Sequence, residues 1–277
     1  MIKKEIRDMI RNDFLINDKT IKDVIREYGI GRTLAYQLLS EAKTSYPKPH
    51  MVNSTIDGDI VGVIGDTHFP YSRKGYLEFC YETFRKNGVT RVVHIGDLVD
   101  HHAWSRHMTE PDANSGLTEY EMAYEKVQKM KVMFEEWDIT LVLGNHDSIC
   151  QRQVATLGLP SVVIKSFGEL YGVPEWNIVT SAIIDNTEYR HGIGCTATLL
   201  TAQRIRRNLV CGHSHSKADI QCHANWDSVV WGMHVGSGVD DSELAFRYGK
   251  ENVLKSIVSC ATVQYGKFPQ LHLMDLY

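Results

Sequence analysis

The sequence predicts an α/β fold in which two β-sheets are flanked by helices, preceded by a small all-α domain. From about residue 51 onwards, short apolar segments that end in glycine and a polar cluster alternate with helical segments, and further strand-like segments follow residue 226. The first 50 residues show a helical period alone. We therefore predict two domains, residues 1–50 and residues 51–277, the second large enough to bury one sizeable core.

The first domain is predicted to hold helical segments at residues 3–15 and 19–42, because apolar side chains recur there near a period of 3.6 residues. A helix from Thr20, a turn at Gly29 and a second helix from Arg32 through Ala42 resemble the helix-turn-helix of small DNA-binding domains. The second helix would present outward Arg32, Thr33, Tyr36 and Gln37. A helical bundle used for packing or oligomerisation is the alternative interpretation.

Charge and prolines set this first domain apart. Residues 1–50 carry ten Lys or Arg against seven Asp or Glu, about +3, which leaves about −7 for the rest of a chain whose net charge is −4. A basic first domain indicates nucleic acid as a partner. Two prolines in residues 45–50 predict a linker there. Because no apolar run reaches about 18 residues and the start is charged, we expect no membrane partner and a cytoplasmic location.

In the second domain, the predicted strands end in polar clusters. Apolar runs at residues 60–64, 91–95, 140–143 and 209–211 each lead into glycine followed by Asp, Asn or His, and a further strand around residues 183–189 leads to His191. Three helices are predicted between them, at residues 75–87, 118–137 and 198–207, the middle one with a capping box from Thr118 to Glu121. Later strands are predicted at residues 228–231, 233–235, 256–265 and 271–274. Residues 151–176 indicate only a mixed connection, with a cap over the strand ends as one interpretation.

The polar residues at the strand ends are suited to metal binding. Carboxylate and amide oxygens mixed with imidazole suit Mn²⁺, Fe or Zn²⁺, and the six cysteines form no CxxC pair, which disfavours a thiolate site. Seven candidate ligands are too many for one ion, but they suit two ions that share a bridging carboxylate. The candidate residues at these strand ends are Asp66, His68, Asp97, Asn145, His146, His191, His213 and His215.

Five motifs occur in one order: D-x-H, G-D-x-x-D, G-N-H-D, a single His before Gly, and G-H-x-H. In this order they resemble the calcineurin-like metallophosphoesterases over residues 58–275. The resemblance implies a layered sandwich of two sheets and two divalent ions, most often Mn²⁺, with Fe, Zn²⁺ or Ni²⁺ as alternatives. One ion would be bound by Asp66, His68 and His215, the other by Asn145, His191 and His213, with Asp97 bridging both.

The resemblance also implies roles around the metal ligands. His146 would lie beside the substrate phosphate as general acid or transition-state stabiliser, while Asp147 and Asp100 would orient imidazoles. His223 and His234 compete for the place of His191, although we interpret both as structural. His94 is interpreted as a core residue, and a polar loop at the site entrance is predicted from His101, His102 and His107.

The expected reaction is hydrolysis of a phosphodiester by a metal-bridging hydroxide. His101-His102 stands where the protein Ser/Thr phosphatases of this superfamily carry Arg-Gly, so the arginine that grips a phosphomonoester is absent there. The helix-turn-helix favours nucleic acid, or nucleotides, as the substrate. The motifs are shared with the Mre11 and SbcD nuclease branch, and the layout is similar to phosphoesterases encoded by bacteriophages, which would act in the host cytoplasm. The alternatives are a phosphomonoesterase on nucleotides or phosphoproteins and a non-catalytic DNA-binding regulator, and the oligomeric state stays open.

Overall fold

The computed structural model describes residues 6, 9–10, 21–35, 38, 58–105, 114–192, 195, 197–242 and 255–275. The chain divides into two compact units, residues 1–55 and 56–277, and each is described by itself. The predicted boundary near residue 50 falls outside the described residues, so the two predicted domain limits stay predictions.

The first unit contains helix α2 (Ile21–Tyr28), which ends at a turn where Gly29 adopts a left-handed φ of 61°. Helical backbone resumes at Arg32. Ile10, Val24 and Leu38 form the buried centre of this unit. The helix, turn and helix order therefore occurs where the sequence places it, with Arg32 exposed. Tyr36 and Gln37 lie outside the described residues, and the assignment as a helix-turn-helix stays a prediction.

The second unit contains two β-sheets, which confirms the predicted α/β sandwich. The first sheet has the order β11-β10-β1-β2-β3-β4, and the second has the order β5-β6-β7-β9-β8. Strands β1 to β4 are parallel neighbours, and so are β6, β7 and β9. The first sheet consists of β1 (Ile60–Ile64), β2 (Arg91–His94), β3 (Asp138–Val142), β4 (Asn177–Val179), β10 (Ser259–Gln264) and β11 (Phe268–Leu273). The second consists of β5 (Ser181–Ile184), β6 (Thr187–Arg190), β7 (Asn208–Cys211), β8 (Ala218–Ala224) and β9 (Val229–Val235).

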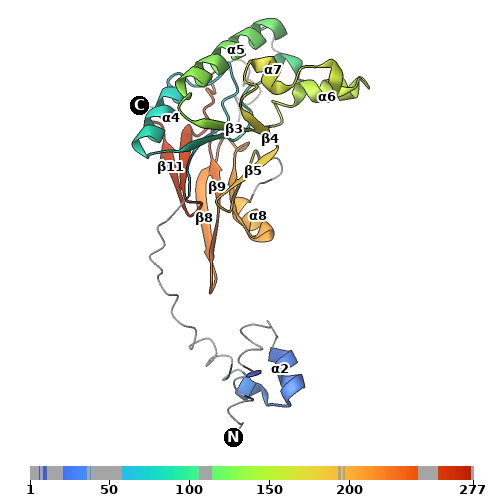
Figure 1. Cartoon of the computed structure of the whole chain (residues 1–277), viewed down its shortest axis with the longest axis vertical. Coiled ribbons are helices and arrows are strands. Elements are labelled where there is room, and N and C mark those ends of the chain that lie inside the picture. The colour runs from blue at the N-terminus through green and yellow to red at the C-terminus, as the bar shows by residue number, and fades with distance from the viewer. Residues whose placement is uncertain are drawn as a thin grey trace. The chain divides into compact units, whose positions relative to one another are not determined.

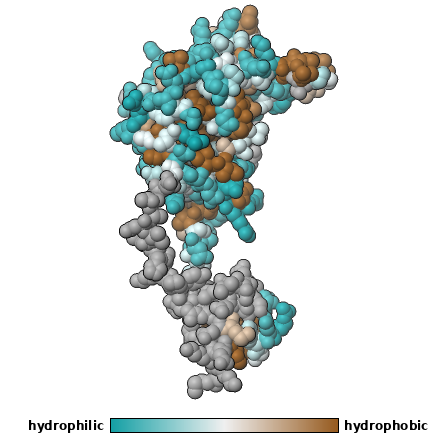
Figure 2. All heavy atoms as spheres, viewed as in Figure 1, coloured by the Kyte–Doolittle hydropathy of each residue, from teal (hydrophilic) through white to brown (hydrophobic). Residues whose placement is uncertain are grey.

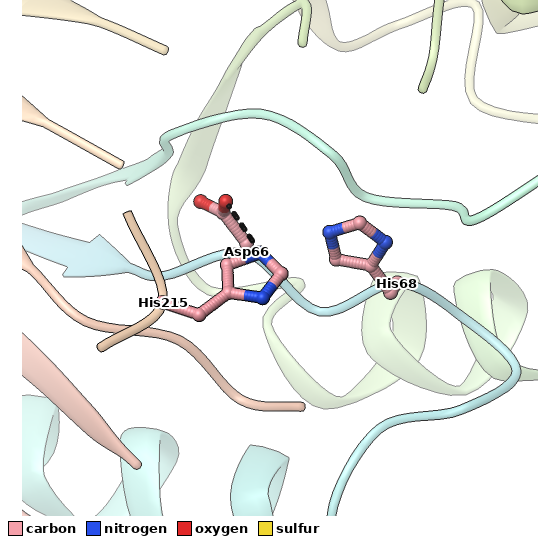
Figure 3. A group of neighbouring side chains, drawn as sticks. All are labelled: Asp66, His68 and His215. Carbon is pink, nitrogen blue, oxygen red and sulfur yellow. Dashed lines mark ion pairs between the residues drawn. The ribbon is translucent and has the colours of Figure 1, made fainter. Parts of the chain in front are cut away.

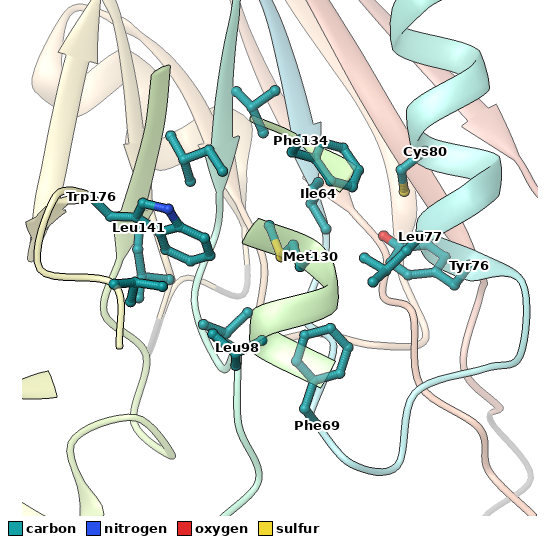
Figure 4. Close-up of a cluster of buried hydrophobic side chains, with 14 of the residues drawn as sticks. Ile64, Phe69, Tyr76, Leu77, Cys80, Leu98, Met130, Phe134, Leu141 and Trp176 are labelled. Carbon is teal, nitrogen blue, oxygen red and sulfur yellow. The ribbon is translucent and has the colours of Figure 1, made fainter. Parts of the chain in front are cut away.

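Side chains alternate between two apolar layers along the strands, as the two-residue period of a strand requires. In β1, Val61 and Val63 join the cluster that includes Tyr189 and Met233 of the second sheet, and this cluster fills the space between the sheets. Ile64 joins the other large cluster, which contains the buried face of α5 and is drawn in Figure 4. Both faces of the first sheet are therefore covered, which holds the carboxyl ends of its parallel strands in a fixed frame.

Helices α4 (Tyr76–Lys86) and α5 (Gly116–Met133) lie along the first sheet, whereas α8 (Thr198–Ile205) packs on β9 of the second (Figure 1). The region after β3 contains α6 (Ile149–Thr156), a 3-10 turn (Ser161–Val163) and α7 (Phe167–Tyr171). Leu157 and Val162 are exposed after α6, and Figure 2 shows apolar residues gathered at one end of the second unit. The mixed connection predicted at residues 151–176 is therefore a series of short helices.

Four details differ from the sequence predictions. Strands β4 and β8 are additional. The single strand predicted around residues 183–189 is the antiparallel pair β5 and β6, and the strands predicted at residues 228–231 and 233–235 form the single strand β9. Helix α5 begins earlier than predicted, because Ser115 is its N-cap and accepts a hydrogen bond from the Thr118 N–H, so the predicted capping box at Thr118 is wrong. Among the described helices, none has the length and apolar content needed to cross a bilayer.

Candidate metal centre

The strand ends of both sheets converge on one place. Asp66 follows β1, Asp97 follows β2 and Asn145 follows β3, while His191 follows β6 and His213 follows β7. Parallel strands present their carboxyl ends at the same edge of a sheet, so these short loops meet. All ten residues predicted from the sequence lie in these loops, and the distances below connect them.

The first donor set is formed by Asp66, His68 and His215, whose ligand atoms lie within 4.8 Å of one another (Figure 3). Asp66 Oδ2 lies 3.3 Å from His215 Nε2 and accepts a hydrogen bond from the His213 N–H. The other oxygen of this carboxylate, Oδ1, is buried without a hydrogen-bond partner among the described residues. A buried oxygen of this kind costs free energy unless a cation binds it.

The second donor set is formed by Asp97, His191 and His213, again within 4.8 Å. His191 Nε2 lies 3.0 Å from Asn145 Oδ1, 3.1 Å from Asp97 Oδ2 and 3.2 Å from His213 Nδ1. One ring nitrogen carries at most one proton and cannot satisfy three such neighbours together. The crowding of four donor atoms around one point fits a divalent cation.

Asp97 links the two sets. Its Oδ2 lies 3.1 Å from His191 Nε2 in the second set and 3.5 Å from His68 Nε2 in the first. Its Oδ1 accepts a hydrogen bond of 2.8 Å from the His146 N–H, which fixes the carboxylate between the two groups. The geometry is that of a carboxylate placed to bridge two ions, and the residues present therefore fit a two-metal centre.

Mutual electrostatic interactions shift the pKa values of the two carboxylates and of the His191 imidazole in opposite directions. Burial raises the pKa of Asp66, but His191 and His215 outweigh burial and hold it below its usual value. Burial also raises the pKa of Asp97. The neighbouring His191 and His68 outweigh burial and hold this pKa far below the usual range. Burial lowers the pKa of His191, yet the carboxylates of Asp66 and Asp97 raise it to about 9. The two carboxylates are thus ionised, whereas His191 must lose its proton before its Nε2 can bind an ion.

Asp100 connects two imidazoles at the edge of the first set. Its Oδ1 lies 2.5 Å from His68 Nδ1 and 3.3 Å from His146 Nδ1, and its backbone oxygen lies 2.5 Å from His146 Nδ1. His68, Asp100 and His146 could also be grouped as metal ligands. We assign Asp100 to positioning, because its hydrogen bonds occupy the Nδ1 atoms of both imidazoles and leave the Nε2 atoms of His68 and His146 for other partners.

Asp147 differs from its predicted role. Its buried carboxylate accepts hydrogen bonds from the Gly144 N–H at 2.8 Å and the Val99 N–H at 3.2 Å, rather than from an imidazole. Both donors belong to backbone whose amides would otherwise be buried without partners. Asp147 therefore fixes the backbone of the loop that carries Asn145 and His146. Its effect on their side chains is indirect, because it bonds to backbone amides.

Two glycines allow the loops to approach this closely. A Cβ added at Gly144 would lie 2.1 Å from Asp97 Oδ1, and one added at Gly212 would lie 2.3 Å from Asp66 Oδ1. Any larger residue would displace a ligand carboxylate. The glycines of the G-N-H-D and G-H-x-H motifs are therefore required by space.

A layer of residues behind His146 was not predicted from the sequence. His101 Nδ1 donates to the backbone oxygen of His146 at 2.9 Å, and the Tyr171 hydroxyl lies 2.6 Å from His101 Nε2. Glu119 of α5 accepts the N–H groups of His102 and Ala103. His101 and His102 are buried, so the predicted polar entrance loop is wrong for both, because these contacts draw them inward. His107 lies outside the described residues.

The remaining histidines lie apart from the donor sets. His94 is buried and lies 3.0 Å from the Thr67 hydroxyl, which confirms it as a core residue. His234 lies 3.0 Å from Asp219 Oδ1 and 3.2 Å from the Cys195 backbone oxygen. His223 is exposed on β8. Neither of the last two replaces His191.

The family of this chain is shown by comparing its sequence with profiles of known protein families. The profile of the calcineurin-like phosphoesterases matches residues 60–230. The chain belongs to the calcineurin-like phosphoesterase family. As a member of this family it is a metal-dependent phosphoesterase, a hydrolase that acts on ester bonds. A comparison of this chain with curated proteins gave no match.

Solved structures similar to this phosphoesterase include an archaeal phosphodiesterase, with 15% identity, a TM-score of 0.43 and coverage of 78% of this chain and 99% of that chain. Vacuolar Protein Sorting 29 from Cryptosporidium parvum has 17% identity, a TM-score of 0.38 and coverage of 78% and 97%. Vps29 from Chaetomium thermophilum has 13% identity, a TM-score of 0.35 and coverage of 74% and 81%.

Proposed function

We propose that this phosphoesterase hydrolyses phosphodiester bonds with two divalent ions, most often Mn²⁺, and that nucleic acid or nucleotides are its substrates. The observation that carries the proposal is the pair of donor sets joined by Asp97, with His146 at their edge. Asp66, His68 and His215 would hold one ion, and Asn145, His191 and His213 the other. When bound, such ions lower the pKa of water and neutralise phosphoryl oxygens.

His146 supplies the acid. Burial lowers the pKa of its imidazole, but the hydrogen bond to Asp100 and the charge of Asp97 outweigh burial and raise it to about 9, so the ring carries a proton at neutral pH. During hydrolysis the water oxygen bonds to phosphorus and loses a proton to solvent. The bond from phosphorus to the leaving oxygen breaks, and that oxygen keeps the electron pair and takes the proton of His146.

The loop after β2 favours a diester over a monoester. A phosphomonoester carries one more negative charge at neutral pH, which an arginine in this loop would balance. His101 and His102 stand there instead, and both are buried, with His101 bonded to the backbone oxygen of His146. A phosphomonoesterase acting on nucleotides or phosphoproteins is the second candidate, and the absence of this arginine argues against it.

The first unit supports nucleic acid as the substrate. This unit has the order of a helix-turn-helix: helix α2, a turn at Gly29 and helical backbone from Arg32. We propose that residues 1–50 hold nucleic acid by its phosphates while the second unit cuts it. A non-catalytic DNA-binding regulator would keep the binding and lack the turnover.

The test is hydrolysis of bis(p-nitrophenyl) phosphate by the full chain with Mn²⁺, compared with p-nitrophenyl phosphate and with single- and double-stranded DNA and RNA. We expect the diester to be preferred over the monoester and at least one nucleic acid to be cut. Asp97→Asn is the matched inactive control. A preference for the monoester supports the second candidate, and duplex binding without any turnover supports the regulator.

A further inference from the structure

Two hollows lie on either side of Asn145. The first, of about 520 Å³, is lined by His146, and the second, of about 500 Å³, is lined by His191. Asn145 and Arg152 line both, so these two residues form the ridge that separates them. Each hollow is within the size range of small-molecule sites, and both open onto the proposed metal centre.

Arg152 is held on this ridge by its neighbour. Its Nη2 donates a hydrogen bond of 2.6 Å to the backbone oxygen of Asn145. No carboxylate pairs with Arg152 among the residues that the structure describes, whereas Arg190 in the second hollow pairs with Glu188. A guanidinium offers five N–H donors in a planar fork that matches phosphate oxygens, so Arg152 has donors left for a ligand on the ridge.

The two hollows share a mixed lining. Beyond His146, the first is lined by the apolar Ile149 and Ala155 and by the polar Ser105, Gln153 and Thr156, and no carboxylate lines it. The second is lined by Leu143, Thr180, Ser181, Glu188 and Arg190. Each lining offers apolar surface together with hydrogen-bonding groups, so each fits a bulky group that carries both, such as a nucleoside.

We propose that the two hollows hold the two ester arms of one phosphodiester, with the leaving group beside His146, the retained arm beside His191, and Arg152 binding the phosphate between them. The proposal rests on the proposed phosphodiesterase function, because an acid must lie next to the leaving oxygen. The substrate class is then a diester of two bulky alcohols, such as a dinucleotide or a nucleic acid strand. A diester with one small alcohol leaves the second hollow empty.

Two substitutions fill one hollow each. Ala155→Trp fills the first, and Ser181→Trp fills the second, and both positions are exposed. The substrates are bis(p-nitrophenyl) phosphate, with two large arms, and methyl p-nitrophenyl phosphate, whose leaving group is the nitrophenol. We expect Ala155→Trp to lower kcat/KM for both esters about tenfold or more. We expect Ser181→Trp to lower kcat/KM for bis(p-nitrophenyl) phosphate about tenfold relative to kcat/KM for methyl p-nitrophenyl phosphate.

Arg152 is tested with the same two esters. Arg152→Ala should raise KM for both about 10- to 100-fold with little change in kcat, because a charge-assisted hydrogen bond to phosphate is lost. Arg152→Lys should recover part of the loss, and a rise in KM without a fall in kcat separates phosphate binding from a purely structural role, which would lower kcat as well. Arg85→Ala is the matched control, because Arg85 is an exposed arginine that lines neither hollow. Calorimetric binding of bis(p-nitrophenyl) phosphate with Ca²⁺ in place of Mn²⁺ should show the same order of affinities.

The outcomes separate this proposal from the function on which it rests. If the wild-type chain with Mn²⁺ hydrolyses neither ester, the phosphodiesterase function is wrong. If it hydrolyses both, but Ser181→Trp changes them equally or Arg152→Ala leaves KM unchanged, the assignment of the hollows is overturned. Thermal unfolding checks each variant, and Thr156→Trp, which lines the first hollow, replaces Ala155→Trp if that variant does not fold.

Discussion

Replacing Gly144 with alanine tests how tightly the loops around the metal centre are packed. The added Cβ would lie 2.1 Å from Asp97 Oδ1 and 2.4 Å from the Asp97 backbone nitrogen. Ordinary van der Waals contact begins at 3.4 Å, so the carboxylate would have to move by about 1.3 Å, the difference from the shorter distance. A misplacement of about 1 Å at a reacting centre can cost on the order of 10²-fold in rate.

Gly144→Ala should therefore lower kcat/KM for bis(p-nitrophenyl) phosphate about 10²-fold and reduce the bound Mn²⁺ measured by elemental analysis. Overpacking of this kind costs roughly 1–3 kcal/mol of stability, so the variant should still fold. Gly31→Ala is the control, because no atom lies within 4 Å of the Cβ added there and its φ is not left-handed. Wild-type activity and metal content in Gly144→Ala would refute the assignment of Asp97 as the bridging ligand.

Three further results are expected. His146→Ala should lower kcat about 10²- to 10⁴-fold on a dinucleotide, whose alkoxide leaving group needs a proton, while the bound metal is retained; a loss below about tenfold on this substrate would remove the role. Chelation should abolish hydrolysis, and Mn²⁺ at 100 times its dissociation constant should restore it and add about 2.7 kcal/mol to the free energy of unfolding for each ion bound, about 5.4 kcal/mol for two; activity that survives complete chelation contradicts the two-metal centre. Burial raises the pKa of Glu119 to about 7, so its contribution to stability is full below about pH 4.5 and is lost as the pH rises to 7. Glu119→Gln should flatten that decline by on the order of 3 kcal/mol in urea unfolding, and an unchanged decline would show that Glu119 does not titrate in this range.

The sequence predicts the strands that end in polar clusters because their signal is local. An apolar run followed by glycine, as in Ile60–Ile64, needs no information from other parts of the chain. Strand β8 lacks such a signal, since most of its side chains are exposed and it is held by pairing with β9. Strand β4 has three residues at the edge of the first sheet. Both depend on a partner strand, which periodicity along the chain does not reveal.

The same distinction applies to the candidate site. The ten residues that carry motifs could be predicted, because their chemical type and their place at a strand end are both visible in the sequence. The partners of Asp147 could not, because the choice between an imidazole and the Gly144 and Val99 amides depends on how two loops cross. The contact between His101 and Tyr171 joins residues 70 positions apart, and only the packing of α7 brings them together.

The backbone of the loops shows how the donor arrangement is kept. His68, Asp97 and His213 adopt left-handed φ values of 47°, 47° and 66°, which cost roughly 1–3 kcal/mol each for residues other than glycine. The first two lie where the loops hold each other, since the Asp97 backbone oxygen accepts the Thr67 and His68 N–H groups at 3.1 and 2.9 Å. Hydrogen bonds between these loops hold the left-handed residues His68 and Asp97 in place. The donors after β1 and β2 are therefore positioned by contacts within the chain, and such contacts are what a preorganised metal site requires.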